Sequence, residues 1–270
     1  MRLTLARSPK DVSAHFSDVA EVYHDLRTTD QEPIISIKNQ LRHLLYKPSI
    51  NAADIGCGNG RYSLLLPLHL GDRLRLTLAD KNRCMLNTLT KRLDHTCSLE
   101  VIQSSAECIP VCEKSFDFAT AFNAAHHFKL KDFLAEMARI LKDEGLLFIY
   151  TRTQEQNRCN IWGKCFPDFC KKETRLWKER DFCGVVAQTS QFALQDSVYF
   201  TYRRVSSLER LIEQAEGHHY STFWLYSDKS FREALDRFQQ NITAQFTDPA
   251  KIQWTDENTL FVLKKIREAR

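Results

Sequence analysis

A glycine-rich turn after a short apolar run constrains the fold of this chain more than any other feature. In NAADIGCGNGRYSLLLP, residues 51–67, Gly56, Gly58 and Gly60 alternate, and Asp54 lies two residues before the first of them. Glycines at this spacing let the backbone turn sharply and approach a ligand closely. The turn therefore predicts a ligand site at the end of a buried strand.

Strands and helices alternate along the first half of the chain. Apolar runs suited to buried strands cover 51–56, 74–80, 99–105, 116–123 and 146–152. Between them lie segments with helical spacing, most clearly 130–142. Right-handed crossovers then give a parallel sheet with helices on both faces, and a ligand site where the strand order reverses. The glycine turn is expected at that point.

Composition restricts the remaining possibilities. The chain has 270 residues, 43% hydrophobic and 27% charged, which is enough to bury a core. It has no apolar run long enough for a signal peptide or a membrane span, so a cytoplasmic location without a membrane span is expected. The net charge of +4 permits a nucleic-acid partner without indicating one. Cys159, Cys165, Cys170 and Cys183 lack a C-x-x-C pair, so buried thiols are expected rather than a metal site.

Two nucleotide-binding motifs do not fit the turn. A dinucleotide fingerprint needs a third glycine where this chain has Arg61, and a phosphate-binding loop needs a G-K-[ST] sequence that does not follow. The pattern that remains is D-x-G-x-G-x-G. A carboxylate such as that of Asp54 suits a cofactor with an ammonium and a sulfonium better than it suits a pyrophosphate.

The segment ADIGCGNG resembles the first motif of the class I S-adenosylmethionine-dependent methyltransferases. Three further segments are similar to the group that includes the ubiquinone and menaquinone biosynthesis enzymes, and the resemblance spans roughly residues 50–153. They are LTLADKN, SSAECIPV, and SFDFATAFNAAHHF with the FLAEMARILKDEGLLFIYT that follows it. The resemblance implies a Rossmann-like, doubly wound α/β sheet of seven strands with helices on both faces. This sheet is mostly parallel, with an antiparallel last strand at the edge and a helical insertion before it.

The resemblance also implies S-adenosyl-L-methionine as cofactor and assigns residues to it. Asp80 is placed to accept hydrogen bonds from both ribose hydroxyls, and Ser105 stands where the family has an aspartate near the adenine. Arg27 is expected to pair with the methionine carboxylate. The expected cofactor-binding residues are Tyr23, Arg27, Asp54, Gly56, Cys57, Gly58, Asp80, Lys81, Ala106, Glu107 and Asn123.

The rest of the chain is expected to hold the methyl acceptor within one methyltransferase domain. Its parts are an N-terminal helical cap (1–49), the cofactor-binding core (50–153), a substrate wall with the sixth strand (154–205), a lid insertion (206–250) and the final strand (251–270). Aromatic rings of the insertion can cover a pocket over the methyl group. His126, Tyr220 and Phe223 are the expected substrate-binding residues, and His127 is the first choice as a general base.

Three functions compete on this evidence. The leading one is methyl transfer to a small molecule by in-line displacement. The second is a tRNA-modifying methyltransferase whose phosphate-contacting rim is Arg152, Lys164, Lys171, Lys172, Arg175 and Lys178. The third is a cofactor-binding regulatory protein without a methyl acceptor. These patterns leave the acceptor atom and the oligomeric state open.

Overall fold

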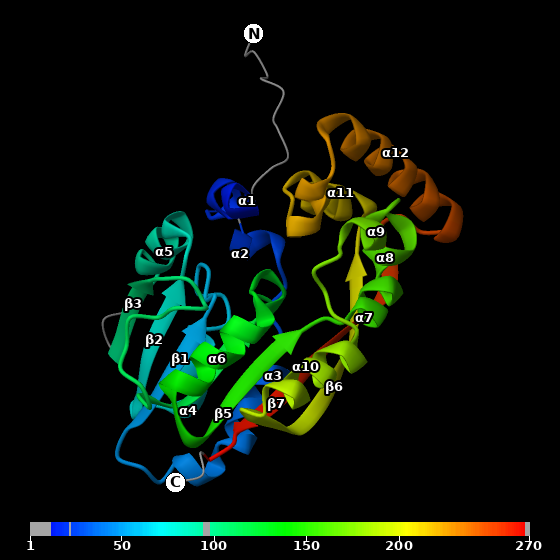
Figure 1. Ribbon diagram of the computed structural model, residues 1–270. Helices are drawn as coiled ribbons and strands as arrows, with labels where there is room; N and C mark the ends of the chain where they lie inside the picture. The colour runs from blue at the N-terminus through cyan, green and yellow to red at the C-terminus, as the bar shows by residue number, and fades with distance from the viewer. Residues whose placement is uncertain (1–11, 22, 94–97, 268–270) are drawn as a thin grey trace.

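The sheet has seven strands and runs through the whole molecule (Figure 1). The computed structural model describes residues 12–21, 23–93 and 98–267, and the side chains of these except 12–15, 23 and 24. The strands are β1 (Ile50–Ile55), β2 (Leu74–Asp80), β3 (Ser98–Gln103), β4 (Phe116–Phe122), β5 (Leu141–Thr151), β6 (Phe192–Ser206) and β7 (Ile252–Lys265). Their order is β3-β2-β1-β4-β5-β7-β6. β1 to β5 are parallel, and β7 is antiparallel to both of its neighbours.

Helices surround the sheet, as the alternating pattern predicts. Those of the first half of the chain are α1 (Val12–Val19), α2 (Tyr23–Leu26), α3 (Glu32–Gln40), η1 (Arg42–Leu44), α4 (Leu65–Leu70), α5 (Arg83–Thr90), η2 (Ala125–His127) and α6 (Leu130–Ile140). The others are α7 (Gln154–Cys159), α8 (Ile161–Cys165), α9 (Phe169–Lys172), α10 (Glu179–Thr189), α11 (Leu208–Glu216), η3 (Ser221–Leu225) and α12 (Asp228–Gln245). Among the described residues, no helix combines the length and the apolar character needed to cross a bilayer.

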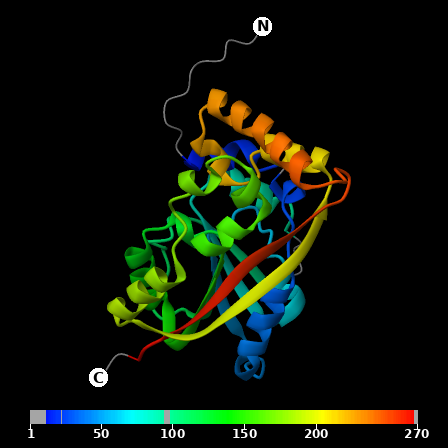
Figure 2. The ribbon, with the colours of Figure 1, turned by 90° about the vertical axis from the view of Figure 1, so that its right-hand side faces the viewer.

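The last strand does not form the edge of the sheet, which corrects the expectation above. β7 lies between β5 and β6, and β6 is the edge strand. Residues 258–263 of β7 form a continuous buried run, which needs neighbours on both sides, whereas most of β6 is partly or fully exposed. Figure 2 shows the long β6–β7 pair rising along one side of the molecule.

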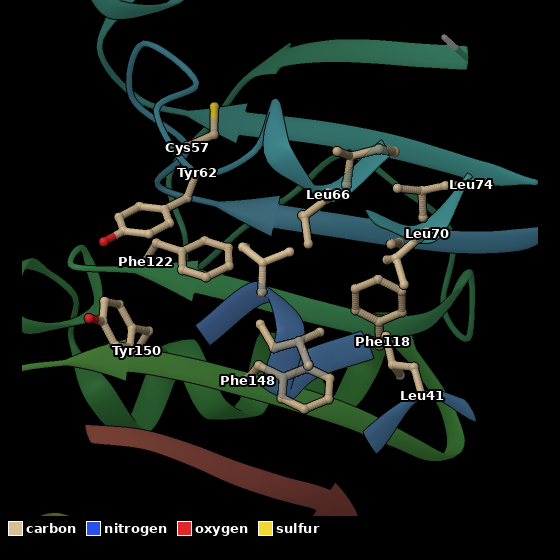
Figure 3. Close-up of a cluster of buried hydrophobic side chains, with 14 of the residues drawn as sticks. Leu41, Cys57, Tyr62, Leu66, Leu70, Leu74, Phe118, Phe122, Phe148 and Tyr150 are labelled. Carbon is tan, nitrogen blue, oxygen red and sulfur yellow. The ribbon is translucent and has the colours of Figure 1, made fainter. Parts of the chain in front are cut away.

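Two hydrophobic cores lie on opposite faces of the sheet. On one face, α3 and α4 pack against side chains of β1, β2, β4 and β5. On the other, α6 and α10 pack against β4, β5 and β7. Figure 3 shows part of the first core, where the rings of Tyr62, Phe122 and Tyr150 gather at the carboxyl ends of the strands. The Tyr62 and Phe122 rings stack with centroids 4.8 Å apart, and this contact holds the aromatic surface beside the glycine turn in place.

A third core builds a helical cap, defined as α8, α9, α11, η3 and α12. Its centre is an aromatic cluster of Trp162, Phe166, Phe223 and Phe238, with stacked Trp162 and Phe238 rings 5.0 Å apart. Figures 1 and 2 show this cap at the end of the sheet toward which β5 runs. The insertion between β6 and β7 thus shares one core with helices that precede β6.

The chain enters the cap through a well-defined turn after β5. Thr153 caps α7 and forms a capping box with Gln156, whose side chain also donates to Thr259 of β7. This arrangement fixes the direction of the chain directly after Arg152, a residue of the site described next.

Candidate cofactor and acceptor site

In the glycine turn between β1 and α4, two of the three glycines pack against neighbouring side chains and one faces open space. Gly56, Gly58 and Gly60 have φ of 70°, 55° and 82°, a region that favours glycine. A Cβ on Gly56 would lie 2.6 Å from Ala124 Cβ, and one on Gly60 would lie 2.3 Å from Leu89 Cδ1. A Cβ on Gly58 would meet nothing within 4 Å. The first and third glycines are therefore needed for packing, and Gly58 leaves space for a ligand.

Asp80 holds the turn in place from the end of β2. Its Oδ2 accepts from Gly58 N and its Oδ1 from Asn82 N, both at 2.8 Å. Burial raises the pKa of this carboxyl, and the two backbone hydrogen bonds oppose that rise. Each carboxylate oxygen keeps a second acceptor position, so Asp80 can fix the turn and still bind a ligand hydroxyl.

Asp54 lies beneath the turn and is 1% exposed. Its carboxylate accepts from the Ser63 hydroxyl and, at 2.7 Å, from Thr120 Oγ1. Burial is the largest influence on this group and raises its pKa to about 7. A bound cation would favour the ionised form, so Asp54 suits a positively charged ligand.

A pocket of about 110 Å³ lies over the turn. Nine of the eleven residues predicted to bind the cofactor line it: Asp54, Gly56, Cys57, Gly58, Asp80, Lys81, Ala106, Glu107 and Asn123. Ser104 also lines it, and within the described residues its buried Oγ has no hydrogen-bond partner. Ser105, the residue aligned with the family's aspartate, pairs with Cys108 instead and does not line the pocket. The open face of Gly58 and the unpaired Ser104 hydroxyl fit a nucleoside-bearing cofactor.

A second cavity, of about 350 Å³, adjoins this pocket and lies between the sheet and the cap. Both have five lining residues in common, namely Phe16, Arg61, Tyr62, Asn123 and His127. Asn123 has a φ of 52° and donates its N–H to Tyr150 O, so the chain leaves β4 in an unusual conformation where the two spaces meet. We call the larger space the acceptor cavity.

Two neighbouring histidines of η2 border the acceptor cavity. The His126 and His127 rings lie 4.1 Å apart, and Arg175 Nη1 lies 3.4 Å from His127 Nδ1. Burial lowers the pKa of His126 to about 3, and burial together with His126 and Arg175 lowers the pKa of His127 well below its usual range. Both rings are neutral at pH 7. The base role of His127 stays a prediction, and these surroundings favour a hydrogen-bond donor.

Arginines and carboxylates alternate along the wall of the acceptor cavity. Arg152 donates to Asp256 Oδ1 at 3.0 Å and to the Tyr220 hydroxyl at 3.1 Å. The guanidinium of Arg204 donates a bidentate pair of hydrogen bonds to the carboxylate of Asp30, at 2.8 and 2.6 Å. Arg152 and the ion-paired Arg204 keep a pKa above the usual arginine range despite burial, because Tyr220 and Asp256 favour the charged form of Arg152 and Asp30 favours that of Arg204.

The remaining predicted residues fall in different places. Arg27 lines the acceptor cavity, not the smaller pocket; it lies 4.4 Å from the Tyr220 ring and donates to His219 O. Tyr220 and His126 line the same cavity. The side chain of Tyr23, which begins α2, lies outside the described residues.

Phe223, predicted to bind the substrate, does not line the cavity. It is 0% exposed and packs in the core of the cap, with its ring centroid 6.4 Å from that of Tyr220. The residues predicted to form a phosphate-contacting rim lie in different surroundings, and the rim stays a prediction. Arg152 pairs with Asp256 and Arg175 with Glu173 in the interior, whereas Lys164, Lys171 and Lys178 are exposed.

Arg61 is a site residue that sequence reasoning missed. It is 8% exposed, lines both the pocket and the acceptor cavity, and donates to Thr28 O. Its guanidinium also lies over the Tyr62 ring at 4.6 Å, and no carboxylate pairs with it in the described part of the chain. A buried cation without a carboxylate favours binding of an anion. In the sequence, Arg61 stands directly after the third glycine. Its presence there excludes the dinucleotide motif, and no ligand role was predicted for it.

Comparisons with known proteins agree with this geometry. Residues 53–149 match a family model described as a methyltransferase domain. An uncharacterized protein of Methanocaldococcus jannaschii is 35% identical over 99 residues, 36% of this chain and 35% of that protein. A demethylmenaquinone methyltransferase of Lysinibacillus sphaericus is 24% identical over 181 residues, 62% of this chain and 77% of the relative. A mouse tRNA (carboxymethyluridine(34)-5-O)-methyltransferase is 29% identical over 116 residues, 42% of this chain and 16% of the relative.

Solved structures share the fold at low identity. The cyclase SpnF superposes with a TM-score of 0.60 at 12% identity, over 98% of this chain and 99% of that one. Geranyl diphosphate C-methyltransferase from Streptomyces coelicolor has a TM-score of 0.51 at 12% identity, over 86% and 76% of the two chains. Residues 53–149, which hold the glycine turn and most of β1 to β5, thus match a methyltransferase domain, and the strand order and the pocket over the glycine turn support a class I S-adenosylmethionine-dependent methyltransferase.

Proposed function

We propose that this chain transfers the methyl group of S-adenosylmethionine to a small molecule held in the acceptor cavity. The proposal rests on one observation, that the pocket over the glycine turn adjoins the acceptor cavity. The pocket over the glycine turn and the acceptor cavity share five lining residues, among them Asn123 and His127. A methyl donor in the first can therefore face a nucleophile in the second.

The residues of the smaller pocket would hold the cofactor by charge and by hydrogen bonds. Asp54 would balance its positive charge, Asp80 would accept from the ribose hydroxyls, and the Ser104 hydroxyl is available to the base. Arg61 is the better candidate for the methionine carboxylate, because it lines this pocket and Arg27 does not. When bound, S-adenosylmethionine supplies a methyl group already activated by its sulfonium.

The catalytic task of the protein is then to align the acceptor and exclude water. The cap covers the acceptor cavity with Trp162, His219 and Tyr220, whose neighbours are fixed by the aromatic core behind them. Alignment of a nucleophile with the bond to be broken lowers the barrier without a strong base. His127 would act as a positioning donor at the boundary of the two spaces.

Relatives support a small acceptor. The demethylmenaquinone methyltransferase and a Mycobacterium ulcerans enzyme that methylates phthiotriol and phenolphthiotriol dimycocerosates both carry small-molecule or lipid substrates in their names. The likeness to a tRNA methyltransferase favours RNA as the second candidate, although Arg152 and Arg175 are turned inward and are not part of an outer basic surface.

The test is cofactor binding followed by methyl transfer. Calorimetry should detect binding of S-adenosylmethionine and none of NADH. Methyl-labelled cofactor is then incubated with the protein and separate small-molecule, RNA and protein fractions of a cell extract. Label in the small-molecule fraction supports the proposal, and label in RNA supports the second candidate. Binding without transfer to any fraction would mean a regulatory protein, and absence of binding would reject the assignment.

A further inference from the structure

Two nitrogen donors on the wall of the acceptor cavity lack a partner. Arg204 of β6 and Trp254 of β7 are directly opposite in the antiparallel ladder and line the cavity. Within the described residues, the buried Arg204 Nε and Trp254 Nε1 form no hydrogen bond. Asp256 Oδ2 is 3.5 Å from Arg204 Nε, an ion-pair contact that forms no hydrogen bond with this nitrogen. Two buried N–H groups from paired residues of one cavity wall, both without acceptors, favour a ligand that supplies oxygens.

One of these donors belongs to a buried cation. Arg152 and Arg204 line the cavity, and Asp30 and Asp256 are the carboxylates paired with them. Asp256 serves Arg152 and only lies near Arg204 Nε. Arg61, which has no carboxylate partner among the described residues, would bind the carboxylate of the cofactor in the proposed function. A charged N–H donor binds an anionic oxygen more strongly than a neutral one. The two unpaired donors are therefore suited to an anionic ligand.

The same cavity offers only weakly basic proton acceptors. Arg175 can only donate, so the Nδ1 of His127 accepts and its proton lies on Nε2. His219 Nδ1 donates to the carbonyl oxygen of Gln214 and so leaves Nε2 as an acceptor, and the buried Nδ1 of His126 has no hydrogen-bond partner among the described residues. Burial lowers the pKa of both of these rings, to about 3 for His126, so neither takes up a proton readily. Glu173 is occupied by Arg175 and Thr222. A phenol or a protonated amine would need a stronger proton acceptor before it could attack, whereas a carboxylate needs none.

We propose that the acceptor is a carboxylate and that the product is its methyl ester. The inference rests on the proposed methyl transfer and adds the chemical class of the acceptor. A carboxylate oxygen forms a bond to the methyl carbon, and the bond between that carbon and the sulfonium breaks. The electron pair of that bond stays on sulfur, which becomes a neutral thioether, and no proton is released. The N–H groups of Trp254 and Arg204 bind the oxygens of the acceptor.

The first experiment determines the type of bond that carries the label. Methyl-labelled cofactor and the full chain are incubated with small-molecule and RNA fractions, and each product is treated with mild alkali. A methyl ester releases its label as volatile methanol, whereas methyl ethers, methylamines and C-methyl groups keep it. Volatile label from either fraction supports the carboxylate, and the fraction identifies its source. Alkali-stable label overturns the carboxylate, and in the small-molecule fraction it leaves the proposed function intact. No label in any fraction rejects both.

The second experiment tests the donors on the wall. Trp254→Phe keeps the ring and removes the N–H, and Trp177→Phe is the matched control because Trp177 packs against the opposite core and lines neither space. The KM for the labelled acceptor should rise about tenfold or more in Trp254→Phe, with kcat and cofactor affinity nearly unchanged. An unchanged KM would reject the role of this donor.

The third experiment measures binding without turnover. Benzoate and benzamide have the same shape, and only benzoate is an anion. With S-adenosylhomocysteine present and ionic strength held constant, benzoate should raise the thermal midpoint, and Trp254→Phe should reduce that rise. Benzamide should have little effect. An equal shift with both compounds would overturn the anion site.

Discussion

The guanidinium of Arg175 lies 3.4 Å from Nδ1 of His127, and this contact determines what the histidine can do. An arginine has no acceptor atom, so His127 must accept at Nδ1 and keep its proton on Nε2. Burial, with the neighbouring His126 and Arg175, holds the pKa of His127 well below its usual range. The ring is thus a neutral donor over the physiological pH range.

Replacement of His127 by glutamine should be mild. Glutamine keeps a donor, so kcat should fall less than about tenfold, the range of one neutral hydrogen bond. Loss of a general base would cost a factor of about 10² to 10⁴. Steady-state kinetics with the labelled acceptor distinguishes the two, and a loss in the larger range would restore the base role. The tautomer can be read directly from ¹⁵N shifts of the ring.

Gly58 and Gly60 should separate cofactor binding from stability. Both have positive φ, so alanine at either strains the backbone by about 1–2 kcal/mol. Gly58→Ala adds a methyl group in open space over the pocket and should lower cofactor affinity at least about tenfold by blocking close approach. Gly60→Ala forces a contact with buried Leu89 and should lose about 1–3 kcal/mol more stability.

Calorimetry and denaturant unfolding measure the two effects on the same proteins. The folded fraction of Gly60→Ala should bind the cofactor nearly like the wild type, because Gly60 does not line the pocket. If Gly58→Ala kept full affinity, the cofactor would have to lie away from the turn.

Asp54 should make the ligand-free protein less stable as pH rises. Its pKa is about 7 in the folded chain and 3.8 without burial, so the folded chain binds more protons between these values. Stability then falls with pH across that window, by about 1.4 kcal/mol per pH unit at most. Asp54→Asn removes this contribution. Relative to the wild type, the variant should therefore be more stable at pH 8 than at pH 4.5.

The comparison across pH isolates this one group. Other titrating groups are the same in both proteins, and the hydrogen bonds from Ser63 and Thr120 that asparagine weakens affect both pH values. Urea unfolding at several pH values measures the difference, and cofactor affinity should fall in the variant because the charge partner is gone. A difference in stability that does not vary with pH would mean an ordinary pKa for Asp54.

The cofactor-binding residues could be predicted from local sequence patterns. Contacts between elements that lie far apart in the sequence could not. Asp54, Asp80 and the glycines lie within 27 residues at strand ends, where chain order fixes their positions. The pairing of Arg204 with Trp254 depends on the insertion of β7 between β5 and β6. The burial of Phe223 depends on the shared core of the cap, since an aromatic run of this kind does not indicate which ring faces a cavity.

Asp80 should matter for the cofactor and Asp117 only for the fold. Asp80→Ala removes an acceptor for the ribose and the anchor of Gly58 N, and should weaken binding on the order of 1.5–3 kcal/mol. Asp117 is a matched control, a buried carboxylate that accepts from Asn51 N and pairs with Lys47 and Lys142 away from both spaces. Asp117→Ala should lower stability alone. Unchanged affinity in Asp80→Ala would exclude the ribose contact.

Tyr220 and Phe223 lie three residues apart in the cap, and replacing them should change different properties. The Tyr220 variant should change acceptor kinetics, and the Phe223 variant should lose stability. The Tyr220 ring lies 4.4 Å from the Arg27 guanidinium and 5.5 Å from that of Arg152, so Tyr220→Ala removes the surface on which two cavity arginines rest. Turnover should fall or the range of acceptors should broaden, while cofactor affinity changes less than about twofold, since Tyr220 does not line the smaller pocket. Phe223→Ala opens a cavity in the aromatic core and should cost about 3–5 kcal/mol of stability, with near-normal kinetics in the folded fraction.

Thermal unfolding and acceptor kinetics on the two single variants measure both effects. A loss of cofactor affinity in folded Tyr220→Ala would instead bring this ring against the cofactor, and wild-type acceptor kinetics would assign it a purely structural role.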